Sequence, residues 1–200
     1  MLFIDKRIRV ICDQLKKLAV VQKIPVDNLM YKKGNYIHPE DDDASSESFE
    51  NFDSKTMHWY GPDKHYWFRF DFTVPESLNN KPMWMHVRTQ IDEWDDAKNP
   101  QFLLFVNNVA TQGIDMNHRE VFLTESAKAN DTYRFDLQSY TGTLHTEFNL
   151  IVEMMEIDPK IQQLYYDLLV PLEAFSRMDK DDANRMAIEN ILNNTINYLD

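Results

Sequence analysis

The segment HYWFRFDFTVP, residues 65–75, decides the fold because its apolar side chains recur at every second position. Alternation with a period of two is typical of a β-strand that buries one face, and Pro75 ends the run. We therefore predict a strand here that lays an almost wholly aromatic face on a core. That face consists of Tyr66, Phe68, Phe70, Phe72 and Val74.

Further short apolar runs follow at similar spacing, without a helical pattern between them. QFLLFV, residues 101–106, is apolar on both faces, and Asn107-Asn108 supplies a turn after it. Short strands separated by polar turns favour an antiparallel arrangement over βαβ units. The prediction is a mainly β fold, an antiparallel β-sandwich of the jelly-roll or galactose-binding-like kind, over residues 58–157. Its other expected strands are 83–87, 120–123, 133–137 and 146–157.

Helical patterns flank this region. Residues 1–24 predict an amphipathic helix, because isoleucines and leucines recur there at three- and four-residue steps. C-terminal helices are expected over 158–200, with Asp158 as N-cap, Pro159 in the first turn and Pro171 as a kink or end. Residues 25–57 carry the stretch EDDDASSESFENFD, residues 40–53, and are interpreted as an acidic linker or loop.

The amino-acid composition limits the classes of protein to which the chain can belong. The 200 residues are 43% hydrophobic and 27% charged, which is typical of one globular domain. A net charge of −12 repels phosphate backbones, so nucleic acid is excluded as a partner. No apolar stretch approaches the roughly 18 residues of a membrane span, and the N-terminus does not read as a signal peptide. We expect a cytoplasmic chain that binds no membrane, with its one cysteine, Cys12, as an apolar filler.

The densest polar cluster is QGIDMNHREV, residues 112–121. As an active site it would supply an acid and a base, but Asp115 and Glu120 have no fixed separation in a loop and strand. His118 and Glu120 form a chelating pair that lacks a nearby third ligand. The alternative is a loop in which Asp115 and Asn117 bond their own backbone, with Gly113 at positive φ.

Other kinds of chemistry have weaker signals. The sequence has no G-x-S-x-G elbow, and its four glycines are too dispersed for a phosphate-binding loop. Flat aromatic rings stack on the apolar faces of pyranoses, but the same residues also build sandwich cores. A sugar platform and a core role therefore both stay open for Trp59, Tyr60, Tyr66, Trp67, Trp84 and Trp94.

Three stretches together resemble the N-terminal region of glycoside hydrolase family 38 α-mannosidases of the bacterial, vacuolar and cytosolic type. They are WYGPDKHYWFRFDFTVPESLNNKPMWMHV (59–87), QFLLFVNNVATQGIDMNHREVFL (101–123) and IDPKIQQLYYDLLVPL (157–172). The most specific element is QG-x-D-x-NH-x-EV. A departure is Asn108, where a glycine is usual, although asparagine also tolerates the left-handed conformation. The element's positions here are Gln112, Gly113, Asp115, Asn117, His118, Glu120 and Val121.

This resemblance implies a β-sandwich domain that precedes a catalytic β/α barrel in an enzyme hydrolysing terminal α-mannosides. It implies a divalent cation, usually zinc, in the intact enzyme. The partners that it implies are a catalytic domain of the same polypeptide and further subunits of a homo-oligomer. The family's G-H-x-H-x-D motif is absent from the sequence, so no catalytic or metal role passes to any residue here. The chain alone is expected to bind no cofactor, to be inactive, and to serve packing and assembly.

Two alternatives remain open at this point. The first is a carbohydrate-binding module, and the second is a self-contained hydrolase built on Asp115, His118 and Glu120. Residues for contact with a carbohydrate or a neighbouring domain are expected to be Trp59, Trp94, Asp115, Asn117, His118 and Arg119.

Overall fold

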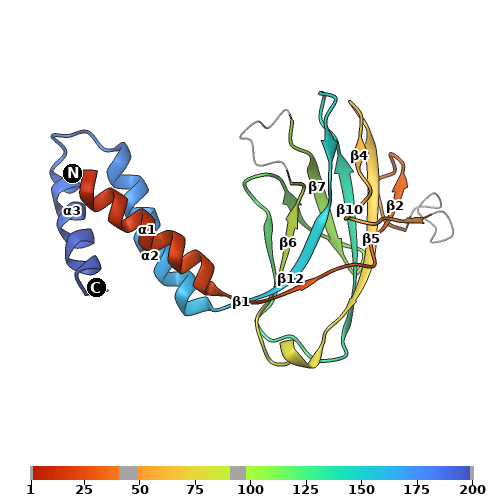
Figure 1. The fold of residues 1–200 in the computed structure, drawn as a ribbon, viewed down its shortest axis with the longest axis horizontal. Coiled ribbons are helices and arrows are strands. Elements are labelled where there is room, and N and C mark those ends of the chain that lie inside the picture. Colours follow the sequence, from red (N-terminus) through yellow and green to blue (C-terminus); the bar gives the residue numbers. More distant parts are fainter. Residues whose placement is uncertain (1, 41–48, 91–97, 199–200) are drawn as a thin grey trace. The chain divides into compact units, whose positions relative to one another are not determined.

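Two compact units make up the chain in a computed structural model that describes residues 2–40, 49–90 and 98–198. The first is the sandwich body, residues 23–156. The second is the helical unit, which joins residues 1–22 to residues 157–200. Each unit is described by itself below (Figure 1).

Two large antiparallel sheets build the sandwich body, as the alternating sequence predicted. The four-stranded sheet has the order β1-β12-β6-β9 and the six-stranded sheet the order β3-β2-β5-β10-β7-β8. A small third sheet pairs β11 with β4. The bounds are β1 Val20–Pro25, β2 Met30–Lys33, β3 Glu50–Asn51, β4 Trp59–Tyr60, β5 His65–Thr73, β6 Met83–Arg88, β7 Gln101–Val106, β8 Val109–Ile114, β9 Glu120–Thr124, β10 Thr132–Tyr140, β11 Glu147–Phe148 and β12 Ile151–Ile157, with a 3₁₀ turn η3 at Glu76–Leu78.

The core between the sheets takes the side chains that the period-two pattern assigned to it. All five predicted core residues of β5 and its end are buried, from Tyr66 to Val74, together with Met83, Met85 and Val87 of β6. Complete burial of such a side chain stabilises the fold by about 1.5–3 kcal/mol. The turn at Asn107-Asn108 also forms, with φ of 49° and 66° at its two residues, so both asparagines are left-handed.

The outer face of β5 is covered as well, which the sequence did not predict. Trp67 is fully buried because the ring of Tyr36 stacks on it at 4.6 Å between centroids and 8° between planes. Phe49 and Phe105 complete this second apolar cluster. The segment that leads to Tyr36 and the one that starts at Phe49 thus lie on the six-stranded sheet.

Residues 25–57 therefore differ from the linker that the acidic composition suggested. β2 and β3 of this range pair within the six-stranded sheet, and Val26, Leu29 and Phe52 enter the main core. The acids dominate the amino-acid composition of this range and suggested a solvated loop. The few apolar residues among them are nevertheless buried, and they hold the segment on the sheet. Residues 41–48 of the acidic stretch lie outside the described part of the chain.

A buried ion pair lies beneath this cover. Arg69 of β5 and Asp136 of β10 are cross-strand partners, and Arg69 Nε donates to Asp136 Oδ1 at 2.6 Å. Arg69 also donates to the carbonyl oxygen of Pro39, and its guanidinium lies 4.3 Å from the centroid of the Phe49 ring. Burial raises the pKa of Asp136 against the opposing effect of Arg69. The pair thus ties the cover to the central strands.

Three helices form the helical unit: α1 Leu2–Ala19, α2 Pro159–Arg177 and α3 Ala183–Ile196. Asp158 caps α2 by accepting from the backbone N–H groups of Lys160 and Ile161, and Pro159 takes the first position, as predicted. The bundle core contains Cys12. No helix in the described ranges is both long and apolar enough to cross a membrane.

Two boundaries in this unit differ from the sequence prediction. α1 ends at Ala19, not near residue 24, because Val20–Pro25 forms β1. Pro171 does not end α2, which continues to Arg177. Leu168, Leu172 and Phe175 pack on both sides of the proline, and we attribute the continuation to this packing, which opposes a local penalty of about 3 kcal/mol.

We predict that Arg69→Ala lowers the free energy of unfolding by about 3–5 kcal/mol, because it leaves the buried Asp136 carboxylate with only the longer contact to Arg134 Nε at 3.5 Å. Urea unfolding followed by far-UV circular dichroism, which reports on both units, measures this loss. The exposed Arg9–Glu173 pair supplies the control, since Arg9→Ala should cost about 1 kcal/mol or less. A double variant, Arg69→Met with Asp136→Leu, should recover most of the stability; a loss as large as that of Arg69→Ala would contradict this account.

Candidate functional site

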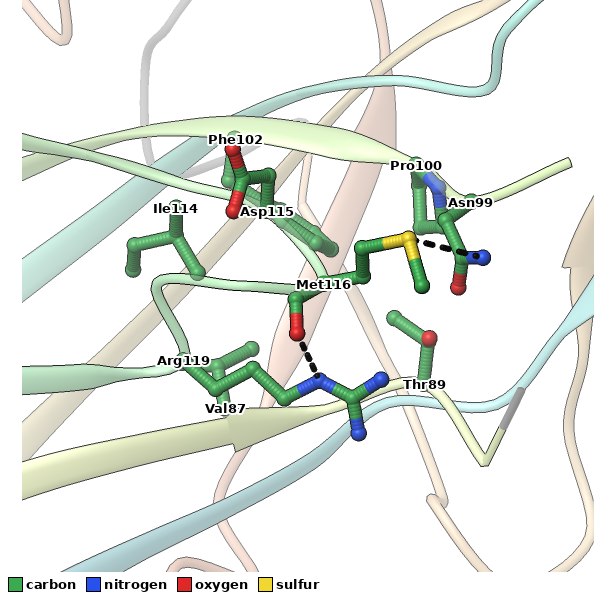
Figure 2. A pocket seen from close by; sticks show the side chains of 9 residues that line it. All are labelled: Val87, Thr89, Asn99, Pro100, Phe102, Ile114, Asp115, Met116 and Arg119. Carbon is green, nitrogen blue, oxygen red and sulfur yellow. Dashed lines mark hydrogen bonds between the residues drawn. The ribbon is translucent and has the colours of Figure 1, made fainter. Parts of the chain in front are cut away.

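The candidate site lies at one end of the sandwich body, where β8 passes into β9. Residues 115–119 form this connection, which we call the Asp115 loop (Figure 2). The loop is fixed at both ends, because Ile114 and Val121 are buried in the main core. Beside it lie Thr89, which follows β6, and Asn99 and Pro100, which precede β7.

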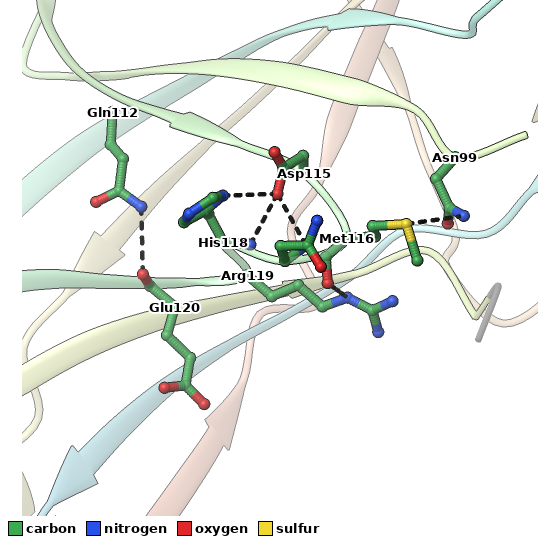
Figure 3. Close-up of polar contacts among 8 residues, drawn as sticks. Asn99, Gln112, Asp115, Met116, His118, Arg119 and Glu120 are labelled. Atoms are coloured by element: carbon green, nitrogen blue, oxygen red, sulfur yellow. Dashed lines mark hydrogen bonds and ion pairs between the residues drawn. The ribbon is translucent and has the colours of Figure 1, made fainter. Parts of the chain in front are cut away.

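Asp115 organises the loop with a single oxygen atom. Its Oδ1 accepts from the backbone N–H groups of Asn117 and His118, both at 2.8 Å, and lies 2.9 Å from His118 Nδ1 (Figure 3). The sequence alternative in which this loop bonds its own backbone is therefore confirmed for Asp115. Asn117 contributes its backbone N–H to the same oxygen.

These contacts set the ionisation of Asp115. Partial burial opposes the charged form, but the hydrogen bonds from Asn117 and His118 outweigh it and hold the pKa of the carboxyl below its usual 3.8. The group is therefore ionised at neutral pH and serves as an acceptor. A general acid needs the opposite shift, toward a pKa near the working pH.

A small hollow opens between the loop and the ends of β6 and β7. Arg119 crosses it and donates from Nε to the carbonyl oxygen of Met116 at 2.9 Å, and Asn99 Nδ2 lies 3.7 Å from Met116 Sδ (Figure 2). The hollow has a volume of about 10 Å³, which is the space of about one water molecule. Pockets that enclose small molecules hold about 300–1,000 Å³, so this hollow does not enclose a ligand.

Glu120 does not join Asp115 and His118. Its side chain points away from them, and its backbone carbonyl accepts from Gln112 (Figure 3). Across the strands Glu120 pairs with His86 of β6. The acid pair that the alternative of a self-contained hydrolase would need is therefore not assembled, because Glu120 is a strand residue whereas Asp115 belongs to the loop. In the described part of the chain, no group of three or more histidine, cysteine, aspartate or glutamate side chains is placed to hold a metal ion.

His86 belongs instead to a charged cluster on the four-stranded sheet. Glu153 Oε2 lies 3.4 Å from Lys23 Nζ, 3.4 Å from His86 Nδ1 and 3.6 Å from Arg88 Nη2. Burial lowers the pKa of His86, although Glu153 and Glu120 favour its charged form. Burial also opposes ionisation of Glu153, but Lys23, His86 and Arg88 hold its pKa below the usual value. Lys23 and Arg88 thus balance the charge of Glu153.

Trp59, which the sequence named for contact with a carbohydrate, belongs to the main core. Trp59 is 1% exposed in the main core, where its Nε1 donates to the carbonyl oxygen of Asn149, so its ring is not accessible to a ligand. Trp94 lies outside the described residues. Gly113 does not have the positive φ that the sequence suggested, because it is an extended residue of β8. Sequence reasoning missed Thr89 and Asn99, which stand in segments without a pattern.

Comparisons with known proteins were made on sequence and on structure. No family model matches the chain, and no curated protein does. Similar solved structures include a glycosyl hydrolase family 2 member from Bacteroides cellulosilyticus DSM 14838, with TM-score 0.46 and 10% identity over 68% of this chain and 20% of that one. A Bacteroides uniformis β-glucuronidase gives TM-score 0.48 and 9% identity over 67% and 18%. A Ruminococcus gnavus β-glucuronidase gives 0.43 and 7% over 68% and 29%.

These findings contradict the family inferred from the sequence. The structures named above are a family 2 glycosidase and two β-glucuronidases, not α-mannosidases of family 38, and no family model supports the resemblance. The expectation of zinc in a parent enzyme rested on that resemblance alone. The chain spans between about a fifth and a third of the length of the structures that it matches.

The Asp115 carboxylate should titrate below 3.8, and the amides of Asn117 and His118 should be protected from hydrogen exchange while it is ionised. Because the folded pKa is depressed, this contribution to stability is complete above the unfolded value and is lost as the pH falls through the folded one. NMR titration of the Asp115 side-chain carbon, with amide exchange between pH 2 and 6, measures both. A pKa at or above the usual value would contradict the geometry.

Proposed function

We propose that the sandwich body is a non-catalytic module that binds carbohydrate at the Asp115 loop. The observation that carries the proposal is the use of Asp115 Oδ1 by three donors of its own loop, at 2.8–2.9 Å. A carboxylate that accepts these hydrogen bonds has a structural role. Because the bonds fix the loop, the loop is a rigid platform.

The arrangement of acids supports a binding role over catalysis. Hydrolysis of a glycoside by the common route uses two carboxyl groups that flank one bond, about 5–10 Å apart. Asp115 is committed to its loop, and Glu120 points away from it (Figure 3). If the module serves an enzyme, the reacting groups belong to another domain of the polypeptide.

The side chains that the loop presents suit sugar hydroxyls. His118 is 69% exposed, and its Nδ1 lies against Asp115, so the ring is oriented with Nε2 available to a ligand. Asn117 adds an amide, and Arg119 places a guanidinium in the hollow (Figure 2). Imidazole and amide groups donate and accept hydrogen bonds in fixed planes, and a guanidinium group donates them in one, as hydroxyl recognition requires. A sugar would rest on the rim of this hollow, with most of its ring in solvent.

Titration of the chain with maltotriose, cellotriose and mannotriose, followed by amide chemical shifts, tests the proposal. We expect saturable shifts at residues 99–102 and 113–120 for at least one sugar, with millimolar affinity. Asp115→Ala should weaken binding at least five-fold, because it releases the backbone of Asn117 and His118.

Asp53→Ala is the matched control for this variant. Asp53 also folds a turn, accepting from Lys55 N and Thr56 Oγ1, but it belongs to the connection between β3 and β4. Its replacement should leave the sugar affinity unchanged. Absence of any shift at 20 mM sugar would remove the carbohydrate proposal and favour a packing role for the same loop.

A further inference from the structure

The outer face of the four-stranded sheet carries a pair of aromatic side chains. Met85 of β6 and Val121 of β9 are cross-strand partners that point into the main core. Because side chains alternate along a strand, Trp84 and Phe122 lie on the opposite face, where they are also partners. Their ring centroids are 5.0 Å apart, with 59° between the ring planes. The two rings thus form an angled pair and not one flat surface.

Both rings are accessible from outside the sheet. Phe122 is 44% exposed, and Trp84 is partly exposed. Within the described residues the indole N–H of Trp84 neither donates a hydrogen bond nor is sealed from solvent. The buried Trp59, by contrast, donates its indole N–H to the carbonyl oxygen of Asn149. Trp84 therefore offers a ligand both a ring and a donor.

A row of polar side chains lies beside the aromatic pair on the same face. His86 follows Trp84 by two residues, a distance of about 7 Å along an antiparallel strand. Its cross-strand neighbours are Glu153 on one side and Glu120 on the other. In the described part of the chain the Glu120 carboxylate makes no hydrogen bond, and it points away from the Asp115 loop (Figure 3). Glu120 is thus an acceptor that the fold itself does not use.

The charges in and beside this row cancel. Lys23 and Arg88 are basic, Glu120 and Glu153 are acidic, and burial lowers the pKa of His86, which favours the neutral ring. The surface is therefore close to neutral, although the whole chain carries a net charge of −12. An anion or a cation would meet as many repelling groups as attracting ones. A neutral ligand that forms hydrogen bonds suits this surface better.

We propose that the outer face of the four-stranded sheet is a second carbohydrate site, which binds a neutral oligosaccharide. A pyranose ring has an apolar face and carries hydroxyl groups around its rim. The apolar face would lie on Trp84 or Phe122, while the hydroxyl groups reach the polar row. An apolar protein surface in the same place would bury the Glu120 carboxylate without a partner, which is costly. The assignment does not depend on sugar binding at the Asp115 loop.

NMR titration of the full chain with cellotetraose, mannotetraose and xylotetraose tests the proposal. The indole N–H resonance of Trp84, assigned with the variant Trp84→Phe, should shift and saturate at millimolar concentrations of at least one sugar. Phe122→Ala and Trp84→Ala should each weaken binding at least five-fold, as followed by the backbone amides of β6 and β9. The thermal midpoint reports whether each variant folds, and Phe122→Ala, at the more exposed ring, decides if Trp84→Ala is unstable.

Tyr166→Ala is the matched control. Tyr166 of α2 is 46% exposed and forms an aromatic pair with Tyr165, with 4.9 Å between ring centroids and 69° between planes. Its replacement removes an equally exposed ring of a similar pair and should leave the sugar affinity unchanged. The anionic trigalacturonate should bind at least ten-fold more weakly than the best neutral sugar; equal binding would overturn the assignment to a neutral ligand.

The positions of the shifts separate this site from the Asp115 loop. Asp115→Ala should leave the response of Trp84 unchanged. Shifts confined to residues 99–102 and 113–119 would overturn the second site and leave the proposed function standing, whereas shifts confined to β6 and β9 would do the reverse. A Trp84 resonance that stays in place at 20 mM of each neutral sugar would overturn the proposal. So would binding by Phe122→Ala with unchanged affinity.

Discussion

The pairing of β5 with β10 is the constraint on which the rest of the sandwich body depends. The two strands run antiparallel over nine residue pairs, from Thr73 opposite Thr132 to His65 opposite Tyr140. One face supplies the centre of the main core, and the other holds the Arg69–Asp136 pair under its cover. A slip of one residue would exchange these faces and bury the charges in the aromatic core, so the register is strongly specified.

This fixed register also determines what the Asp115 loop can do. β10 pairs with β7, and β7 pairs with β8. The last residue of β8, Ile114, is buried and positions the start of the loop. The loop then uses Asp115 to satisfy its own N–H groups. Since the carboxylate is a structural acceptor, the chemistry left to the loop is that of the groups it presents, His118, Asn117 and Arg119. A rigid scaffold with an ordered loop is a common arrangement for binding.

Local patterns in the sequence predicted those parts of the structure that depend on local physics. The alternation in residues 65–75 gave β5 and its buried face, and Asp158-Pro159 gave the start of α2. The bonding of Asp115 to its own loop was also predictable, because aspartate commonly accepts from N–H groups two and three residues ahead.

Features that depend on contacts between distant segments were not predictable in this way. Acidic composition suggested a linker at 25–57, but Tyr36 and Phe49 find their partners on Trp67, a contact between segments that no local pattern records. Asn99 lines the hollow because the chain turns there just before β7, and no local pattern in the sequence marks that turn. The family resemblance failed for a related reason, since short motifs of a sandwich recur wherever strands and turns impose similar residues.

We propose that the polar groups of the Asp115 loop hold structure and ligand, and do not react. The most direct measurement is an assay of the purified chain on a panel of aryl α- and β-glycosides, with and without added divalent cations. We expect release of the aryl group to remain at the rate in buffer under all conditions. Turnover above that rate, abolished by both Asp115→Asn and His118→Ala, would contradict the account.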